Sequence, residues 1–189
     1  MTQGALFSGV GHDPGCKRII RRQPGIEATA NFGGPNDCYR YNLIERWGHG
    51  PLALWCMMNP SGAGAEGTDM TVAKTGRISR RLLMGGQMIA NACAYRATDR
   101  MRLLEVADPV GPGNSAAILA MADKAGLIVV AHGRLPGALQ QHADAMVAML
   151  RLAGHRLWVL RLTPDNIPFH PLARGKGHVP EDIIPSIWE

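Results

Sequence analysis

From residue 52 onward, short apolar runs alternate with segments of helical period, and this alternation constrains the fold more than any other feature of the chain. Each run has the length of a strand and is followed by polar or glycine-containing residues. The pattern is typical of a parallel sheet that helices cover on both faces. We therefore predict an α/β three-layer sandwich with a four-stranded parallel sheet. The expected strands are residues 52–58, 88–94, 127–131 and 157–160.

Three helices are expected among these strands. The first begins near Asp69 or Met70, where the Asp69 carboxylate can cap free backbone amides, and it ends near Gly85. Its apolar and basic side chains fall on different arcs at 100° per residue. The other two helices are expected over residues 113–125 and 136–153.

The first fifty residues have a different pattern. Residues 16–23 and 38–47 alternate like two strands, and a Gly/Pro/Asn-rich connection joins them. We expect an N-terminal antiparallel addition at the edge of the sheet. The length of 189 residues fits a single domain. Its parts are these strands and their connection in 1–50, the core in 51–172, and a tail in 173–189 with weak signals of order.

Composition and charge narrow the class of protein. The chain is 46% hydrophobic and 19% charged, which argues against disorder. It has no apolar run of membrane-spanning length and no signal-peptide layout at its start, so we expect a cytoplasmic protein without a membrane partner. The net charge of +5 permits attraction to nucleic acids and other phosphate polyanions.

Several common types of site lack support. The four cysteines are widely spaced without any Cys-x-x-Cys, so neither a disulfide framework nor a zinc site is indicated. The glycine motifs of kinases and dinucleotide-binding proteins are absent, as are the nucleophile elbow of α/β hydrolases and the His-Glu-x-x-His of metalloproteases. We expect no metal or other cofactor.

Polar side chains follow each of the four expected strands. In open α/β sheets, ligands bind beyond the carboxyl ends of the strands, so these side chains can converge on one concave site. We predict catalytic roles for Asn59, Asp69 and His170, which are a carboxamide, a carboxylate and an imidazole. The predicted substrate-binding residues are Ser61, Arg96, Asp99, His132, Arg134 and Phe169.

Structural roles are the alternative for several of these residues. Asn59 can form an Asx turn, and Arg96 can pair with Asp99 at the surface. His132 can be a buried histidine whose hydrogen bonds are satisfied. For His170, in an otherwise apolar loop, we favour a function, because a neutral imidazole can donate to or accept from a developing charge.

Two basic segments form a candidate surface for nucleic acid. The first expected helix carries Lys74, Arg77 and Arg81 on one arc and starts beside the predicted site. The N-terminal run contributes Arg18 and Arg21. Together these side chains can follow a line of phosphates, and the alternative is an ordinary solvated helix face.

Several segments between residues 39 and 172 resemble a bacterial and phage family known as domain of unknown function 1643. The resemblance itself implies no activity. It is carried by CYRYNLIERW, MMNPSGAGAEGTDMTVAKTGR, NACAYRATDRMRLLEVADPVGPGN, VVAHG and LRLTPDNIPFHPL, which follow one another in the family's order.

A weaker similarity, to uracil-DNA glycosylases, implies a mechanism. Those enzymes have a four-stranded parallel sheet, with one active-site motif after the first strand and another after the last. Residues 59–61 (Asn-Pro-Ser) and 170–172 (His-Pro-Leu) look like these motifs. The similarity implies that a nucleotide is turned into the pocket, where Asn59 positions water, His170 stabilises the departing base and Phe169 stacks on it.

We therefore expect a protein that recognises a nucleobase in DNA or in a nucleotide, and that acts as a DNA glycosylase-like hydrolase or on the base in another way. One alternative is a non-catalytic nucleic-acid or nucleotide-binding module with the same pocket. Another is an enzyme acting on an unrelated small metabolite. The sequence leaves the oligomeric state open.

Overall fold

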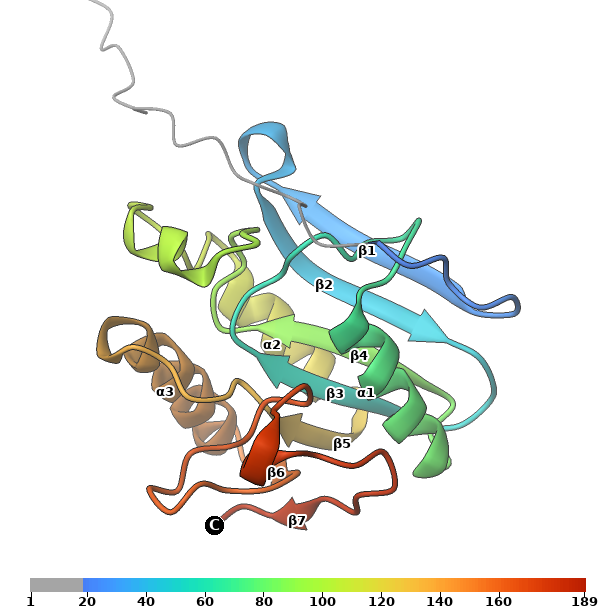
Figure 1. Cartoon of the computed structure of the whole chain (residues 1–189). Coiled ribbons are helices and arrows are strands. Elements are labelled where there is room, and N and C mark those ends of the chain that lie inside the picture. Colours follow the sequence, from blue (N-terminus) through green and yellow to red (C-terminus); the bar gives the residue numbers. More distant parts are fainter. Residues whose placement is uncertain (1–18) are drawn as a thin grey trace, which may run out of the picture.

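The computed structural model describes residues 19–189, which form a mixed seven-stranded sheet with helices on both faces (Figure 1). The strand order is β1-β2-β4-β3-β5-β6-β7. The strands are β1 (Glu27–Gly33), β2 (Tyr39–Arg46), β3 (Leu52–Met57), β4 (Gly86–Asn91), β5 (Ala125–Val130), β6 (Trp158–Val159) and β7 (Ser186–Ile187). The helices are α1 (Met70–Arg81), α2 (Asn114–Ala122) and α3 (Gly137–Leu152), with short 3-10 helices η1 (Pro35–Asp37), η2 (Arg100–Leu104) and η3 (Gly175–Gly177).

The predicted α/β class is confirmed, but the sheet is larger than the four-stranded parallel sheet expected. Strands β4, β3, β5 and β6 pair in parallel, whereas β1, β2 and β7 pair antiparallel toward the two edges. Strand β4 spans residues 86–91 rather than 88–94. The backbone amides of Ala92 and Cys93 still donate to the carbonyl oxygens of Met57 and Met58, each at 2.9 Å, but the chain bends at these two residues and the strand ends.

Two apolar layers enclose the sheet. Helix α1 covers one face, where Val72 and Ile78 belong to the same buried cluster as Trp55. Helices α2 and α3 cover the other face, on the side of Leu54 (Figure 1). Every residue of β3 is buried, and the indole Nε1 of Trp55 donates to Ser79 Oγ at 3.0 Å. Burial on both faces explains why β3 is an unbroken apolar run in the sequence.

Helix α1 begins at Met70, as predicted, but ends at Arg81 instead of near Gly85. Leu83 has a φ of 58°, in the left-handed region that ends a helix. The backbone amide of Leu83 donates to Arg80 O at 3.0 Å. The left-handed conformation of Leu83, a residue other than glycine, explains why the helix ends earlier than expected.

At the N-terminal edge, β2 lies where a strand was expected, but its partner does not. The partner of β2 was expected to be residues 16–23. It is instead β1, which falls in the stretch that we interpreted as a connection. Ile20 forms only an isolated bridge with Thr68, and Arg22 turns toward Glu45, where its Nε donates to Oε1 at 2.8 Å. Side-chain contacts therefore determine the path of this segment. Residues 16–18 lie outside the described part of the chain.

The C-terminal tail was expected to be weakly ordered, and that expectation is wrong. Val179 is buried in the α1 cluster, and its carbonyl oxygen accepts a 2.5 Å hydrogen bond from Lys74 Nζ. Glu181 pairs with Arg77 at 2.7 Å. The last residues then add β7 beside β6. The tail therefore forms one wall of the α1 layer. Over residues 19–189, no helix combines the length and apolar character needed to cross a membrane.

The three cysteines of the described chain are expected to be unreactive in the folded protein. Burial raises the pKa of Cys56 and of Cys93 to about 12, and it also raises the pKa of Cys38. With the thiolate as the reacting form, labelling of Cys56 and Cys93 by iodoacetamide at pH 8 should be at least roughly 100-fold slower in buffer than in urea. Peptide mapping by mass spectrometry assigns the rate to each cysteine. Equal rates for Cys56 in both solvents would contradict its buried position.

Candidate functional site

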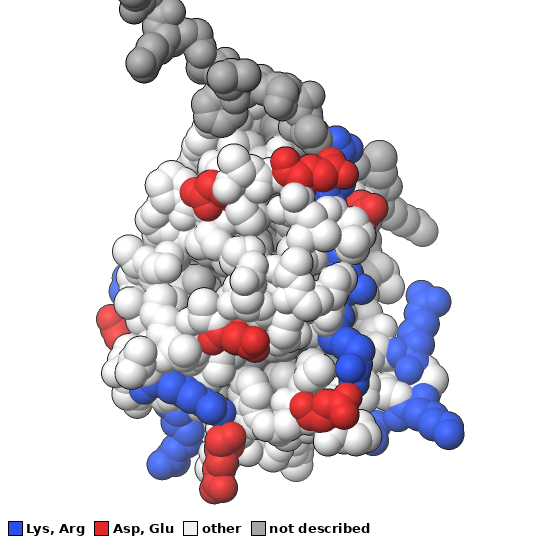
Figure 2. Space-filling view, turned by 90° about the vertical axis from the view of Figure 1, so that its left-hand side faces the viewer, with Lys and Arg blue, Asp and Glu red and all other residues white. Residues whose placement is uncertain are grey.

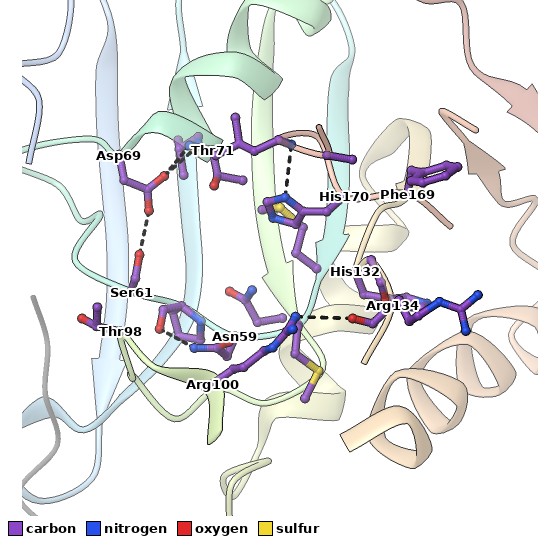
Figure 3. Close-up of a pocket in the computed structure, with 18 of the residues that line it drawn as sticks. Asn59, Ser61, Asp69, Thr71, Thr98, Arg100, His132, Arg134, Phe169 and His170 are labelled. Atoms are coloured by element: carbon purple, nitrogen blue, oxygen red, sulfur yellow. Dashed lines mark hydrogen bonds between the residues drawn. The ribbon is translucent and has the colours of Figure 1, made fainter. Parts of the chain in front are cut away.

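A cavity of about 630 Å³ lies at the carboxyl ends of the parallel strands (Figure 3). Its walls come from the loops that follow β3, β4, β5 and β6. The chain passes from β3 to β4 on one side and then crosses to β5 on the other, so the strand order reverses between β3 and β5. Ligands of open α/β sheets bind at such a reversal, which makes this cavity the candidate site.

All the predicted catalytic and substrate-binding residues except Arg96 line this cavity. They are Asn59, Ser61, Asp69, Asp99, His132, Arg134, Phe169 and His170. Figure 3 shows Ser61 and Asp69 on one side of the space and His132 and Arg134 on the other. Arg96 lies elsewhere: its guanidinium stacks 4.8 Å from the centre of the Phe32 ring and donates to Asp37 O at 3.0 Å.

Asn59 connects two loops of the site. Its Nδ2 donates to Ala97 O at 2.7 Å and to Pro60 O at 3.1 Å. Because a carbonyl oxygen can only accept, these partners require the amide nitrogen on that side. The amide oxygen Oδ1 is therefore the atom of Asn59 that can accept a hydrogen bond from water or a ligand.

Asp69 is the N-cap of α1. Its Oδ1 accepts hydrogen bonds from the amides of Thr71 and Val72, both at 2.9 Å, and its Oδ2 accepts one from Ser61 Oγ at 2.8 Å. Both carboxylate oxygens thus hold the glycine-rich loop against the start of the helix. The structure gives Asp69 a positioning role, whereas the sequence suggested catalysis.

This role predicts different effects for two substitutions of Asp69. Asp69→Ala removes the cap and should lower the free energy of unfolding by about 1–2 kcal/mol. Asp69→Asn should retain most of the stability, because an asparagine oxygen caps a helix about as well. Urea unfolding followed by circular dichroism measures both variants. An Asp69→Ala protein as stable as the parent would refute the capping role.

His132 presents a hydrogen-bond acceptor to the cavity. The side chain is only 3% exposed, and its Nδ1 lies 2.7 Å from the carbonyl oxygen of Gly133. The carbonyl can only accept, so Nδ1 carries the proton and Nε2 has the lone pair. Burial lowers the pKa of His132 below 6.5, which keeps the imidazole neutral at pH 7.

His170 has the opposite arrangement. Its Nδ1 accepts from the amide of Leu172 at 3.1 Å, so in the neutral ring the proton is on Nε2. A Cβ atom at Gly133, whose φ is 75°, would lie 2.9 Å from the Cβ of His170. The close approach requires glycine at that position. The loops after β5 and β6 therefore touch, and they bring an accepting and a donating imidazole into one cavity.

The lowered pKa of His132 predicts a pH effect on stability. Below pH 6.5 the unfolded imidazole binds a proton that the folded, buried imidazole resists, so His132 should reduce the free energy of unfolding as the pH falls from 7.5 to 5.5. The stability of His132→Gln should fall less over this range in urea unfolding. His49→Gln, at an exposed position between β2 and β3, is the matched control and should follow the parent. Identical pH profiles for parent and His132→Gln would argue against the buried neutral imidazole.

Arg40 is the main lining residue that the sequence did not reveal. It is 3% exposed, and its guanidinium donates to Ala63 O at 2.6 Å and to Asn91 Oδ1 at 3.0 Å. With regular alternation along β2, Arg40 and Leu43 would lie on opposite faces of the sheet. A β-bulge at Tyr41 shifts the register and turns both side chains to the α1 face. Other polar lining residues outside the predicted set are Thr71, Asn91, Thr98, Arg100 and Thr163.

The remaining predicted residues lie at the rim of the cavity. Arg134 is exposed and pairs with Asp165, while Asp99 caps η2 by accepting from the amide of Met101 at 2.9 Å. The ring of Phe169 lies against Gly177 and points away from Asn59 (Figure 3), which does not favour base stacking. In the part of the chain that the structure describes, no three His, Cys, Asp or Glu side chains form a metal-binding group.

The predicted basic surface is only partly open. Lys74 is buried under the tail, and Arg77 pairs with Glu181. Arg21 and Arg81 are exposed, and Arg18 lies outside the described residues. Figure 2 views the face toward which the carboxyl ends of β3, β4 and β5 point. Lys and Arg lie along the right-hand side of this view and in a second group at its lower left, and the centre of the face carries few charges.

A family model described as "Protein of unknown function (DUF1643)" matches residues 40–172 of the chain. This range contains β2 from its second residue onward and every residue that lines the cavity except Ala173. Comparison with curated proteins and with solved structures gave no match.

Proposed function

The chain belongs to the DUF1643 family, whose description gives no function. From the geometry of the cavity we propose that it recognises a nucleobase, in DNA or in a nucleotide, and that the protein hydrolyses the N-glycosidic bond of that base. One observation carries the proposal. Asn59, His132 and His170 come from three loops and line one cavity, each with a defined hydrogen-bonding polarity. The two acceptors can orient and deprotonate a water molecule, and the donor can hydrogen-bond to an acceptor atom of a base.

The proposed reaction assigns one task to each of these side chains. Asn59 Oδ1 accepts a hydrogen bond from the attacking water, and the neutral His132 accepts the released proton at Nε2. The water oxygen bonds to C1′ of the sugar as the bond from C1′ to the base nitrogen breaks, and that electron pair leaves with the base. His170 Nε2–H donates toward the developing charge on the base. The departing base takes up a proton from solvent, and His132 returns its proton to solvent. The products are the free base and a sugar with a hydroxyl at C1′.

A binding module without turnover is the second candidate, and the carboxylates of the cavity favour it. Asp69 is committed to the α1 cap and to Ser61, and Asp99 caps η2. Both acidic side chains of the lining thus have structural partners. Without a carboxylate to support the water or the sugar cation, the cavity would bind its ligand and release it unchanged.

The two candidates separate in a product assay. Purified protein is incubated with nucleosides, nucleotides and DNA oligonucleotides that carry uracil, mismatched or modified bases, and free bases are measured by mass spectrometry. We expect release of a base from at least one substrate, with a rate that falls about 100-fold or more in Asn59→Ala and His170→Gln.

Matched controls show whether the loss is specific to the site. Asn31→Ala and His49→Gln remove the same chemical groups from exposed positions outside the cavity and should keep the parental rate. Binding of a substrate without any released base supports the module. Release at the parental rate by both site variants excludes the assigned roles.

A further inference from the structure

We propose that Arg40 binds the terminal phosphate of the ligand, and that the ligand is a free nucleoside monophosphate rather than a base within a DNA duplex. The inference rests on the proposed recognition of a nucleobase and adds the substrate class. It also assigns a function to the buried guanidinium of Arg40, which has no role in the proposed reaction.

The hydrogen bonds of Arg40 leave it incompletely satisfied. Two guanidinium nitrogens donate to the neutral oxygens of Ala63 and Asn91, and the buried Nε has no partner among residues 19–189. No salt bridge to Arg40 occurs in this part of the chain. A buried cation without an anionic partner is costly, so a partner supplied by the ligand is the expected complement.

The carboxylates near Arg40 accept hydrogen bonds from other groups. Asp69 holds the α1 cap, and Glu45 accepts from both Arg22 and Gln87. Burial lowers the pKa of Arg40 to about 10, and the nearby Asp69 charge partly offsets this effect. The guanidinium therefore remains charged at neutral pH, where a phosphate monoester carries between one and two negative charges.

The β-bulge directs this charge into the cavity. Regular alternation in β2 would turn Arg40 to the α2 and α3 face, and the shift at Tyr41 turns it to the α1 face, where it lines the same cavity as Asn59 and His132. Bulges are frequent beside active sites because they redirect single side chains. The bulge therefore places the positive charge on the wall of the cavity.

The distribution of charge favours a small ligand over a duplex. A protein that follows DNA needs unpaired cations around its site. Here Lys74 donates to Val179 O, Arg77 pairs with Glu181 and Arg134 with Asp165, and the centre of the face in Figure 2 carries few charges. The chain within a duplex continues on both sides of each phosphodiester, so such a group cannot easily reach a residue as buried as Arg40, but a terminal phosphate can. A cavity of about 630 Å³ is in the size range of small-ligand sites.

Calorimetry with matched ligands tests this assignment. The ligands are the common nucleosides, their 5′-monophosphates, inorganic phosphate, and short single-stranded oligonucleotides with or without a 5′-phosphate. We expect one monophosphate to bind the parent protein about 10- to 100-fold more tightly than its nucleoside, because its phosphate adds charged hydrogen bonds. Inorganic phosphate should compete with that monophosphate and not with the nucleoside. A stronger effect of the 5′-phosphate on the oligonucleotide than on the nucleotide would assign the site to strand ends and overturn the free-nucleotide class.

Variants locate the effect. Arg40→Met should abolish the advantage of the monophosphate, and Arg40→Lys, which keeps the charge without the forked donors, should retain part of it. Arg156→Met removes an exposed arginine outside the cavity and should leave the advantage unchanged. If Arg40→Met does not fold, the competition by inorganic phosphate and the affinities of the Arg40→Lys protein still test whether Arg40 binds the phosphate.

The outcomes separate this inference from the proposed function. Equal affinity of nucleoside and monophosphate, or no binding of any monophosphate, overturns the role of Arg40, whereas the base-release assay still judges the proposed reaction. Monophosphates that bind through Arg40 with no discrimination among bases, and with no effect of His170→Gln, support the anion site and contradict nucleobase recognition.

Discussion

The parallel hydrogen bonding of β4, β3 and β5 is the constraint on which the candidate site depends. Parallel strands end at the same edge of a sheet, so the loops after them must meet there. The helices after β3 and β5 leave toward opposite faces, and the space between them is the cavity. Asn59 and His132 are therefore neighbours because of the topology, although more than seventy residues separate them in the chain.

Buried polar contacts hold the walls of this cavity in place. Arg22 donates to the carbonyl oxygens of Gly64 and Gly67, at 2.7 and 3.1 Å, and to Glu45. Glu45 also accepts from Gln87 at 2.7 Å, and Gln87 in turn donates to the α1 backbone. The network ties the glycine-rich loop to β2, β4 and α1, so a loop that would otherwise be flexible forms a stable wall. Removing one partner from such a buried ion pair typically costs about 3–5 kcal/mol.

Those features that depend on local pattern could be predicted from the sequence, and those that depend on distant partners could not. The apolar run of β3 and the polar loops after the strands follow from burial and from the rule for parallel sheets. Strand β1 was missed because Ala28 and Ala30 give little strand signal, and Arg40 because a bulge reverses the alternation of β2. The burial of Lys74 depends on Val179, which lies far along the chain.

The family match ends at residue 172, but the packed structure continues beyond it. Val179 is fully enclosed against α1, and the ammonium group beneath it has its hydrogen-bond acceptor on that same segment. A chain trimmed to the matched region would expose apolar surface along the helix whose first turn carries the loop cap. The boundary defined by sequence similarity is therefore narrower than the unit that folds.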